Sequence, residues 1–295
     1  MPYLYRIKLI RWDNDGKEAC RAYCLKHNIL ACGWPAKTEC TSLQEYQAQV
    51  KNMFHKKDEP KTDDKPYDNQ NSWTTAVKAI AEMQPGSLCW TQGKDGKYYL
   101  GKICDNNIYF KEPNYPQIGI YRKCQWQAFE LDDVPGKVIS CLIGGKTLQR
   151  IHEPDIARYS ENLYNGTKQS KINFFPLLHW DDLEDLLGLY LQKEKGYFVF
   201  PSTNKSGTAC YEYMLVNKNG KKAIIQCKTG HSKIDDPSSL IRDRQNMDIY
   251  ITTETDDKIT GKNVHFISKE QLKEFAERNP RILPDRIKKF LEYSK

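Results

Sequence analysis

The dipeptide Asn219-Gly220 stands between two strand-like runs, and this pattern constrains the fold more than any other feature of the sequence. The run before it is CYEYMLVNK and the run after it is KKAIIQCK. Asn-Gly is typical of the tight turn that joins two antiparallel strands, so the pattern predicts a β-hairpin. The apolar segment Ala223–Ile225 in the second run is expected to be buried.

Polar residues follow this apolar segment. Side chains alternate between the two faces of a strand, so Gln226 and Lys228 share one face and Cys227 lies on the other. The hairpin can bring Glu212, in the first strand, close to both Gln226 and Lys228. An unpaired buried amine or amide costs several kcal/mol, so we expect these polar groups to be partners of one another.

A carboxylate, an amide and an amine at the end of a sheet can support phosphodiester hydrolysis. Glu212 and the backbone carbonyl of Cys227 can hold Mg²⁺ through oxygen ligands, and Mn²⁺ can substitute for it. Lys228 can orient or deprotonate a water molecule that the metal activates, while Gln226 positions its neighbours. Glu184, in the preceding helix, can act on the metal site through water or on a second metal. These residues form the predicted catalytic and metal site.

Three segments follow one another along the chain: LEDLLGLYLQKEKGYFVF, YEYML and IIQCK. They are a helix with an acid, a strand with an acid and a strand that ends in Q-x-K. Together they resemble the Mrr-like branch of the PD-(D/E)xK restriction endonuclease-like superfamily, over residues 173–268. The resemblance implies a helix acid at Glu184, a strand acid at Glu212 and a Q-x-K pair at Gln226 and Lys228. The strand acid here is Glu, where that branch more often has Asp.

Other interpretations of these residues remain open at the level of sequence. Glu184 could be a solvated helix residue, with Asp182 or Asp185 as the functional acid. Glu212 and Lys228 could form a plain cross-strand ion pair, which contributes about 0.2–1 kcal/mol.

Three segments of the N-terminal block, ILACGWPA, MQPGSLCWTQGKDGKYYLGKI and CQWQAFELDDVPGKV, resemble the PUA-like group and its EVE-like members, over residues 3–145. The resemblance implies nucleic-acid binding, with a modified base held in an aromatic pocket. Trp34, Trp90 and Trp126 are the candidates for that pocket, because a flipped base stacks on flat aromatic rings. Each could instead be a core residue. Nearby basic residues that could contact phosphates are Lys37, Lys94, Lys97, Arg122 and Lys123.

The order of predicted elements indicates an α+β chain with two domains. Residues 1–150 are expected to form a PUA-like curved β-structure with helices. Residues 151–172 form a polar linker with weak helical character. Residues 173–295 are expected to form an α/β restriction endonuclease-like fold with a central mixed sheet.

Several elements of these blocks can be predicted individually. The segments SLCWTQ and KYYLGKIC flank a Gly-Lys-Asp-Gly turn and predict a second hairpin. The segments NIYFKE, YRKCQWQAFEL and KVISCLI are also expected to be strands. The segment LHWDDLEDLLGLYLQKEKG is the strongest helix prediction, because its leucines share one face.

Composition and charge narrow the functional classes. The 295 residues include 45 Lys+Arg and 38 Asp+Glu, a net charge of +7 that suits a nucleic-acid partner.

No run approaches the ~18 apolar residues of a membrane span. The first residues lack the apolar region of a signal peptide, so we expect a cytoplasmic protein whose cysteines are thiols. Zinc binding around Cys20 and Cys24 is an open alternative.

These features together predict a two-domain, Mg²⁺-dependent endonuclease that hydrolyses DNA phosphodiester bonds. By resemblance, its expected role is restriction of foreign phage DNA that carries a modified base. The alternatives are a catalytically inactive nucleic-acid-binding protein with a degenerate nuclease fold, and an RNA-directed nuclease. A double-strand cut usually needs two active sites, so a homodimer is a possible partner state.

Overall fold

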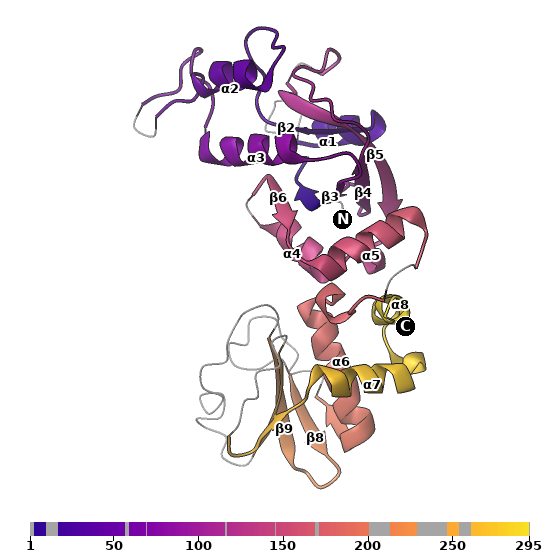
Figure 1. Cartoon of the computed structure of the whole chain (residues 1–295). Coiled ribbons are helices and arrows are strands. Elements are labelled where there is room, and N and C mark those ends of the chain that lie inside the picture. Colours follow the sequence, from indigo (N-terminus) through magenta and orange to yellow (C-terminus); the bar gives the residue numbers. More distant parts are fainter. Residues whose placement is uncertain are drawn as a thin grey trace. The chain divides into compact units, whose positions relative to one another are not determined.

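The computed structural model describes residues 3–9, 17–56, 59–68, 70–115, 117–144, 146–168, 171–200, 213–228, 247–253 and 261–294. The chain is an α+β protein with two mixed β-sheets (Figure 1). It divides into two compact units, which are Met1–Val134 with Val138–Ser170, and Pro135–Lys137 with Lys171–Lys295. The α+β class predicted from the sequence is confirmed.

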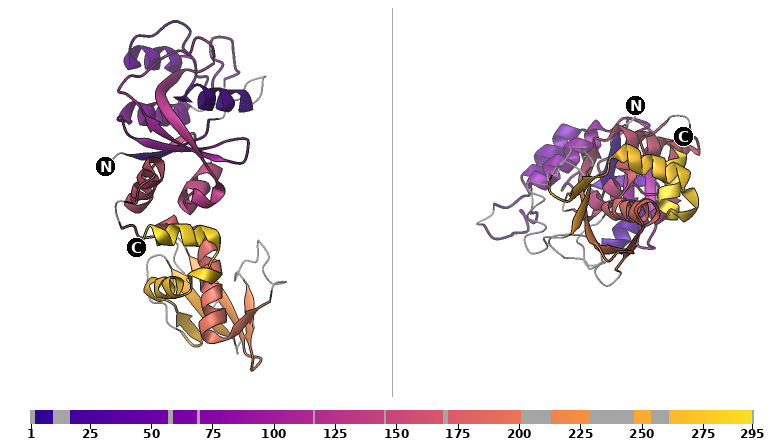
Figure 2. Two further views of the ribbon diagram at one scale, coloured as in Figure 1. Left: turned by 90° about the vertical axis from the view of Figure 1, so that its right-hand side faces the viewer. Right: turned by 90° about the horizontal axis from the view of Figure 1, so that it is seen from below.

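The first unit is built on a six-stranded sheet with the strand order β2-β5-β4-β3-β1-β6. Its strands are β1 (Leu4–Ile7), β2 (Ile29–Cys32), β3 (Leu88–Gln92), β4 (Tyr98–Ile103), β5 (Ile120–Phe129) and β6 (Leu148–Ile151). Strands β1 and β3 are parallel, and the other neighbours are antiparallel. The sheet curls strongly, and the long strand β5 follows this curve (Figure 2).

In the first unit, the predicted hairpin and one further strand are confirmed, and two strand predictions are wrong. The β3–β4 hairpin forms as expected, and β5 is a strand. Residues 107–112 make only one isolated bridge, between Tyr109 and Tyr121. The segment KVISCLI belongs to a helix, α4 (Gly136–Ile143). Val138 and Leu142, four residues apart, are both buried there, whereas Ile143 is 78% exposed. That spacing fits one face of a helix and shows why a short apolar run is ambiguous.

The remaining helices of the first unit pack around the sheet. They are α1 (Lys17–Lys26), α2 (Leu43–Lys51), α3 (Gln70–Glu82) and α5 (Pro154–Asn165), with a 3₁₀ turn, η1, at Leu131–Asp133. Helix α3 buries Trp73, Val77 and Ile80 in the core. The guanidinium of Arg122 donates to the carbonyls of Ile80 at 3.3 Å and Met83 at 2.8 Å, so it caps the end of α3.

Residues 151–172, expected as a polar linker, contain helix α5 and belong largely to the first unit. The helix begins at Pro154 and ends at Gly166, which has a positive φ of 65°. It packs against β3, where the indole N–H of Trp90 donates to the Ser160 hydroxyl at 3.0 Å. Its apolar face includes Ile156 and Tyr159, both buried, and this burial holds the segment on the sheet.

The second unit contains a five-stranded sheet with the order β11-β10-β9-β8-β7. Its strands are β7 (Tyr197–Val199), β8 (Met214–Asn217), β9 (Lys222–Lys228), β10 (Asp248–Thr253) and β11 (Val264–Phe266). Strands β7, β8 and β9 form an antiparallel meander, and β10 and β11 run parallel to β9. The predicted Asn219-Gly220 hairpin is confirmed, with a positive φ of 75° at Gly220.

Helix α6 (Trp180–Lys195) packs on β7 and β9 and is the longest helix of the described residues. Its buried face carries the apolar residues expected from the sequence, which are Leu183, Leu186, Leu187, Tyr190 and Leu191. The Asp182 carboxylate accepts the backbone N–H of His179 at 2.7 Å, which caps the first turn. Helices α7 (Lys269–Arg278) and α8 (Asp285–Glu292) complete the unit, with 3₁₀ turns at Phe175–Leu177 and Pro280–Ile282.

Candidate functional site

Tyr213 connects three elements that carry predicted catalytic residues. Its hydroxyl donates to the backbone carbonyl of Glu184, in α6, at 2.9 Å. Its own carbonyl accepts the N–H of Ile225, in β9, at 3.3 Å. Tyr213 is 5% exposed and directly precedes β8. Tyr213 therefore joins α6 to β9, and it directly follows Glu212 in the sequence, which lies outside the described residues.

The Q-x-K sequence lies at the end of β9, as predicted. Gln226 is opposite Ile251 of β10 and is only 6% exposed. Alternation along β9 places Gln226 on the face that carries Ile224 and Ile251, away from the face on which Tyr213 contacts α6. Cys227 is buried, and the backbone of Lys228 pairs with Thr253. Helix α6 and the Gln226 side chain therefore lie on opposite faces of the sheet.

Glu184 is a buried residue and not a solvated one. It is 9% exposed, in the first half of α6. Asp182 has a structural role, since it caps the helix and lies 3.4 Å from the guanidinium of Arg286. Burial raises the pKa of Asp182 above its ordinary value, and Arg286 opposes this effect. Asp185 is exposed at the helix surface. Asp182 and Glu184 are thus both buried acids of α6, at 8% and 9% exposure, while Asp185 lies beside a pocket that Tyr213 also lines, and burial raises its pKa.

Two predicted residues fall partly or wholly beyond what can be described. Glu212 lies outside the described residues, and so does the side chain of Lys228. Among the residues that the structure describes, no group of three or more His, Cys, Asp or Glu is arranged to hold a metal ion. The proposed donor set combines the carboxylates of Glu184 and Glu212 with the carbonyl of Cys227. These are oxygen donors, and their chemistry fits Mg²⁺.

Of the three tryptophans predicted to line a base pocket, Trp90 is a core residue. It is 0% exposed, its indole N–H is bonded to Ser160, and its ring meets Phe129 edge-on at 5.8 Å. No ring face is open to a base, so the expectation for Trp90 is corrected. The reason is that α5, read from the sequence as part of a linker, covers it.

Trp34 and Trp126 are partly buried, and each is held by specific contacts. The ring of Trp34 stacks on Tyr67 at 4.6 Å with an interplanar angle of 9°. The indole N–H of Trp126 donates to the carbonyl of Ile29 at 3.1 Å. Both tryptophans contact the core of the first unit.

Two of the basic residues near these tryptophans have structural roles. Arg122 is buried, where it caps α3, and cannot reach a phosphate. The Lys37 ammonium lies 2.6 Å from the Asp64 carboxylate. Lys123, in contrast, is exposed on the outer face of β5.

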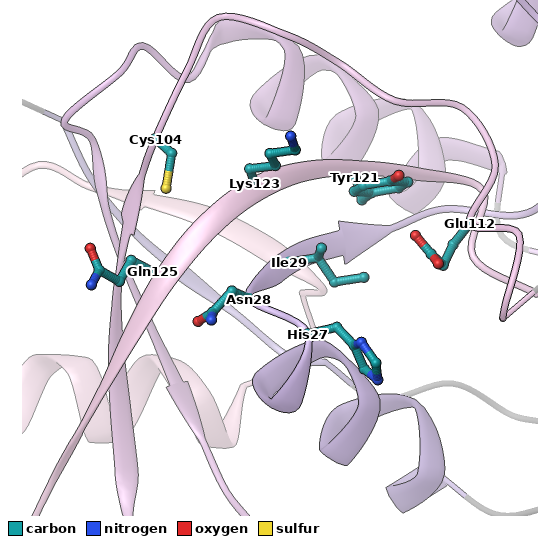
Figure 3. Close-up of a pocket in the computed structure, with 8 residues that line it drawn as sticks. All are labelled: His27, Asn28, Ile29, Cys104, Glu112, Tyr121, Lys123 and Gln125. Carbon is teal, nitrogen blue, oxygen red and sulfur yellow. The ribbon is translucent and has the colours of Figure 1, made fainter.

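A pocket of about 480 Å³ lies on the outer face of β2 and β5 (Figure 3). It is lined by His27, Asn28, Ile29, Cys104, Glu112, Tyr121, Lys123 and Gln125. Alternation along β5 puts Tyr121, Lys123 and Gln125 on this face. Of the residues that line this pocket, only Lys123 was predicted from the sequence, as a phosphate contact. The alternating polar residues of β5 were a usable signal, but the contribution of the segment before β5 required the tertiary structure.

One end of this pocket carries a buried carboxylate among tyrosines. Glu112 is 9% exposed, and its Oε1 accepts the Tyr23 hydroxyl at 2.8 Å. Burial raises the pKa of Tyr121 to about 12, and the charge of Glu112 and a hydrogen bond to it act in the same direction. These tyrosines therefore stay protonated and donate to the carboxylate at neutral pH.

Comparisons of the chain with protein families, with curated proteins and with solved structures found no significant match. No helix in the described part of the chain is long and apolar enough to cross a membrane. Cys20 and Cys24 are both buried, and burial raises the pKa of the Cys32 thiol to about 12. The Cys32 thiol is therefore a protonated core group at neutral pH.

Proposed function

We propose that the chain is a Mg²⁺-dependent endonuclease that hydrolyses DNA phosphodiester bonds. The observation that carries this proposal is the position of Tyr213, which directly follows Glu212 in the sequence and joins Glu184 in α6 to β9 beside Gln226. We propose that the side chains of Glu184, Glu212 and Lys228 meet at the end of β9, around the edge of the sheet. Glu184 is a buried acid in this part of the fold, and buried acids are common at functional sites, which supports the proposal.

The order of elements in the second unit also supports a nuclease. Helix α6 carries the helix acid and precedes three antiparallel strands, and the third of these ends in the Q-x-K sequence. This is the order that the restriction endonuclease-like resemblance implies. Strand β10 then returns parallel to β9, which makes the sheet mixed, as expected.

The residues of this site have separate tasks in the proposed reaction. A bound Mg²⁺ supplies Lewis acidity towards the phosphate and lowers the pKa of a water molecule. The carboxylates of Glu212 and Glu184 and the carbonyl of Cys227 would hold the metal. Lys228 orients the attacking water and offsets negative charge that develops on the phosphate. Gln226, as a neutral amide, positions its neighbours.

The first unit is proposed to read DNA that carries a modified base, in the cytoplasm, as a defence against phage. The net charge of +7 supports a nucleic-acid partner. The curled mixed sheet of the first unit supports the PUA-like expectation, and its outer face carries an open pocket with aromatic and polar lining.

Matched plasmids that differ only in cytosine or adenine modification test this function. The full chain with Mg²⁺ should cut the plasmid that carries one of these modifications and leave the unmodified plasmid intact. EDTA should stop the cutting. Equal inertness towards every plasmid, with binding retained, would contradict the nuclease assignment and favour a non-catalytic DNA-binding protein.

A further inference from the structure

We infer that the pocket on the outer face of β2 and β5 is a nucleotide-binding site. In this site, a base that bears an exocyclic amine donates to Glu112 and its phosphate contacts Lys123. The inference deepens the proposed function and rests on it for the source of the nucleotide, which would be a flipped base of DNA. The volume of about 480 Å³ lies in the range typical of small-ligand pockets.

The acidic end of the pocket selects the base edge. Glu112 accepts the Tyr23 hydroxyl and, at 3.4 Å, the backbone N–H of Asn114, both at Oε1. The Tyr121 hydroxyl is a third donor to this carboxylate. A carboxylate has about four acceptor positions, so these three contacts orient it and leave one position for a ligand N–H. Glu accepts from the amino group of cytosine in DNA recognition, which makes an amine-bearing base the fitting occupant.

Aromatic rings at the same end provide flat surfaces. The ring of Tyr121 is stacked on Tyr109 at 4.9 Å, with an interplanar angle of 14°. The His27 imidazole is stacked on Tyr23 at 4.1 Å. In Figure 3, the rings of Tyr121 and His27 lie on either side of Ile29, near the Glu112 carboxylate. Each ring is already held by a second ring stacked against it. Stacking of a base on it therefore costs little additional conformational entropy.

The opposite charge lies further along the pocket. The Lys123 ammonium lies 5.4 Å from the centre of the Tyr109 ring and belongs to an exposed residue of β5. Cys104 and Gln125 lie at the far end from Glu112 (Figure 3). A ligand with N–H donors at one end and an anion near the other matches this polarity, and a nucleotide has both.

The wall between these ends is rigid, because Trp126 fixes it. The indole N–H of Trp126 donates to the Ile29 carbonyl, and its backbone N–H donates to the Asn28 side chain at 3.3 Å. Asn28 has a positive φ of 56°, a conformation that Asn tolerates better than most residues. Trp126, predicted to be a base-pocket residue, is therefore a positioning residue of this pocket.

The thiol of Cys104 offers a direct test, because it is exposed and lines the pocket. The full chain is alkylated with iodoacetamide, and the rate at Cys104 is followed by mass spectrometry of its peptide. With dCMP or dAMP at about ten times Kd, alkylation of Cys104 should slow about tenfold. TMP, which lacks an exocyclic amine, should protect far less. The partly buried Cys40 and Cys141 do not line the pocket and serve as internal controls.

Two pairs of variants separate the pocket from general charge effects. Lys123→Ala and Glu112→Gln should each remove the protection at Cys104. The controls Lys78→Ala and Glu82→Gln should not, because these residues form an exposed pair at 3.9 Å on α3. Lys123 is exposed, so its variant keeps the test valid even if Glu112→Gln perturbs the fold. Unchanged protection in Lys123→Ala and Glu112→Gln would overturn the inference.

Experiments with duplex DNA test the pocket and the proposed nuclease function separately. Duplexes with methylated or hydroxymethylated cytosine or methylated adenine are compared with an unmodified duplex, in EDTA to prevent cutting. Protection of Cys104 by a bound modified duplex supports both claims. Protection by dCMP or dAMP without binding of any duplex would support nucleotide binding in the pocket. The same result would contradict the proposal that the chain is a DNA nuclease. If a duplex binds but Cys104 is alkylated as fast as in the unbound chain, and no nucleotide protects it, the claim that the pocket binds a nucleotide is overturned. The proposed nuclease function is not affected by that result.

Discussion

The hydroxyl of Tyr213 donates a hydrogen bond of 2.9 Å to the backbone carbonyl of Glu184. This bond joins the start of β8 to the first half of α6. It is buried, so its loss removes a contact between β8 and α6 that water does not readily replace. Because Glu212 is adjacent to Tyr213, the bond is expected to affect catalysis as well as stability.

Removal of this hydroxyl gives the first prediction. Tyr213→Phe keeps the ring and should lower the free energy of unfolding by about 1–2 kcal/mol. Cleavage should fall further than this loss of stability explains, because Tyr213, which directly follows Glu212 in the sequence, loses its hydrogen bond to α6. Urea unfolding and plasmid cleavage, measured on the same preparation, check both effects. A variant with reduced stability but wild-type cleavage would show that the bond has only a structural role.

Gly188 gives a second prediction, with two opposing effects. Alanine in place of a helical glycine usually stabilises by about 1 kcal/mol. A Cβ at Gly188, however, would overlap the Tyr213 hydroxyl. Overpacking of this kind costs about 1–3 kcal/mol, so Gly188→Ala should destabilise the chain.

A double variant tests the cause of that destabilisation. In Tyr213→Phe the nearest remaining ring carbon lies 2.9 Å from the added Cβ, so the overlap is partly relieved. The double variant should then lose less stability than the sum of the two single variants. Additive losses would show that Gly188 and Tyr213 are not in conflict.

Trp90 provides a third prediction, about stability alone. Its ring is fully buried and its N–H is bonded to Ser160, so Trp90→Ala should cost about 3–5 kcal/mol. Ser160→Ala should cost about 1 kcal/mol, since it leaves the indole N–H unpaired. Thermal unfolding checks both values. Retention of the wild-type melting temperature in Trp90→Ala would contradict the core assignment.

The Asp248 carboxylate predicts a pH dependence of stability. Burial tends to raise its pKa, but hydrogen bonds from Lys221, His265 and Tyr197 outweigh burial and hold the pKa below its ordinary value. The folded state therefore binds a proton less readily than the unfolded state, whose Asp pKa is about 3.9. The carboxylate stabilises the fold above that pH, and this contribution is lost as the pH falls through the lower folded pKa.

Asp248→Asn should accordingly be less stable than wild type at neutral pH, and the difference should shrink on acidification. Urea unfolding at a series of pH values between neutrality and strong acid measures this. The reverse trend, with a difference that grows in acid, would contradict the hydrogen-bonded assignment of Asp248.

Much of the second unit could be predicted from the sequence because its signals are local. The Asn219-Gly220 turn and the leucine face of α6 each specify an element within a few residues. Their order along the chain then placed Gln226 at the end of the third strand. The burial of Glu184, and its link to Tyr213, depend on how α6 packs on the sheet, which no local pattern contains.

The first unit was harder to predict, since its features depend on distant contacts. The helix α4 contains a short apolar run that has no decisive period, and α5 contains polar residues that hide its apolar face. Trp90 could be assigned to the core only when α5 was seen to cover it. The outer pocket was missed because Glu112, far from β2 in sequence, is brought to it by tertiary packing.

The cofactor gives a further prediction. Oxygen donors favour Mg²⁺ or Mn²⁺ over softer metals. EDTA should abolish cleavage, and added Mg²⁺ or Mn²⁺ should restore it. Activity that survives exhaustive chelation would exclude the proposed mechanism.

The central claim is that the end of β9 carries out phosphodiester hydrolysis, and Lys228 tests it most directly. Plasmid cleavage with Mg²⁺ is compared between wild type, Lys228→Ala and the control Lys222→Ala, which removes an exposed lysine from the opposite end of the same strand. We predict that Lys228→Ala loses cleavage by at least about a hundredfold, as expected for a catalytic proton-transfer group, and still binds DNA. Lys222→Ala should cut as wild type does. Equal cleavage by Lys228→Ala and wild type would contradict the account.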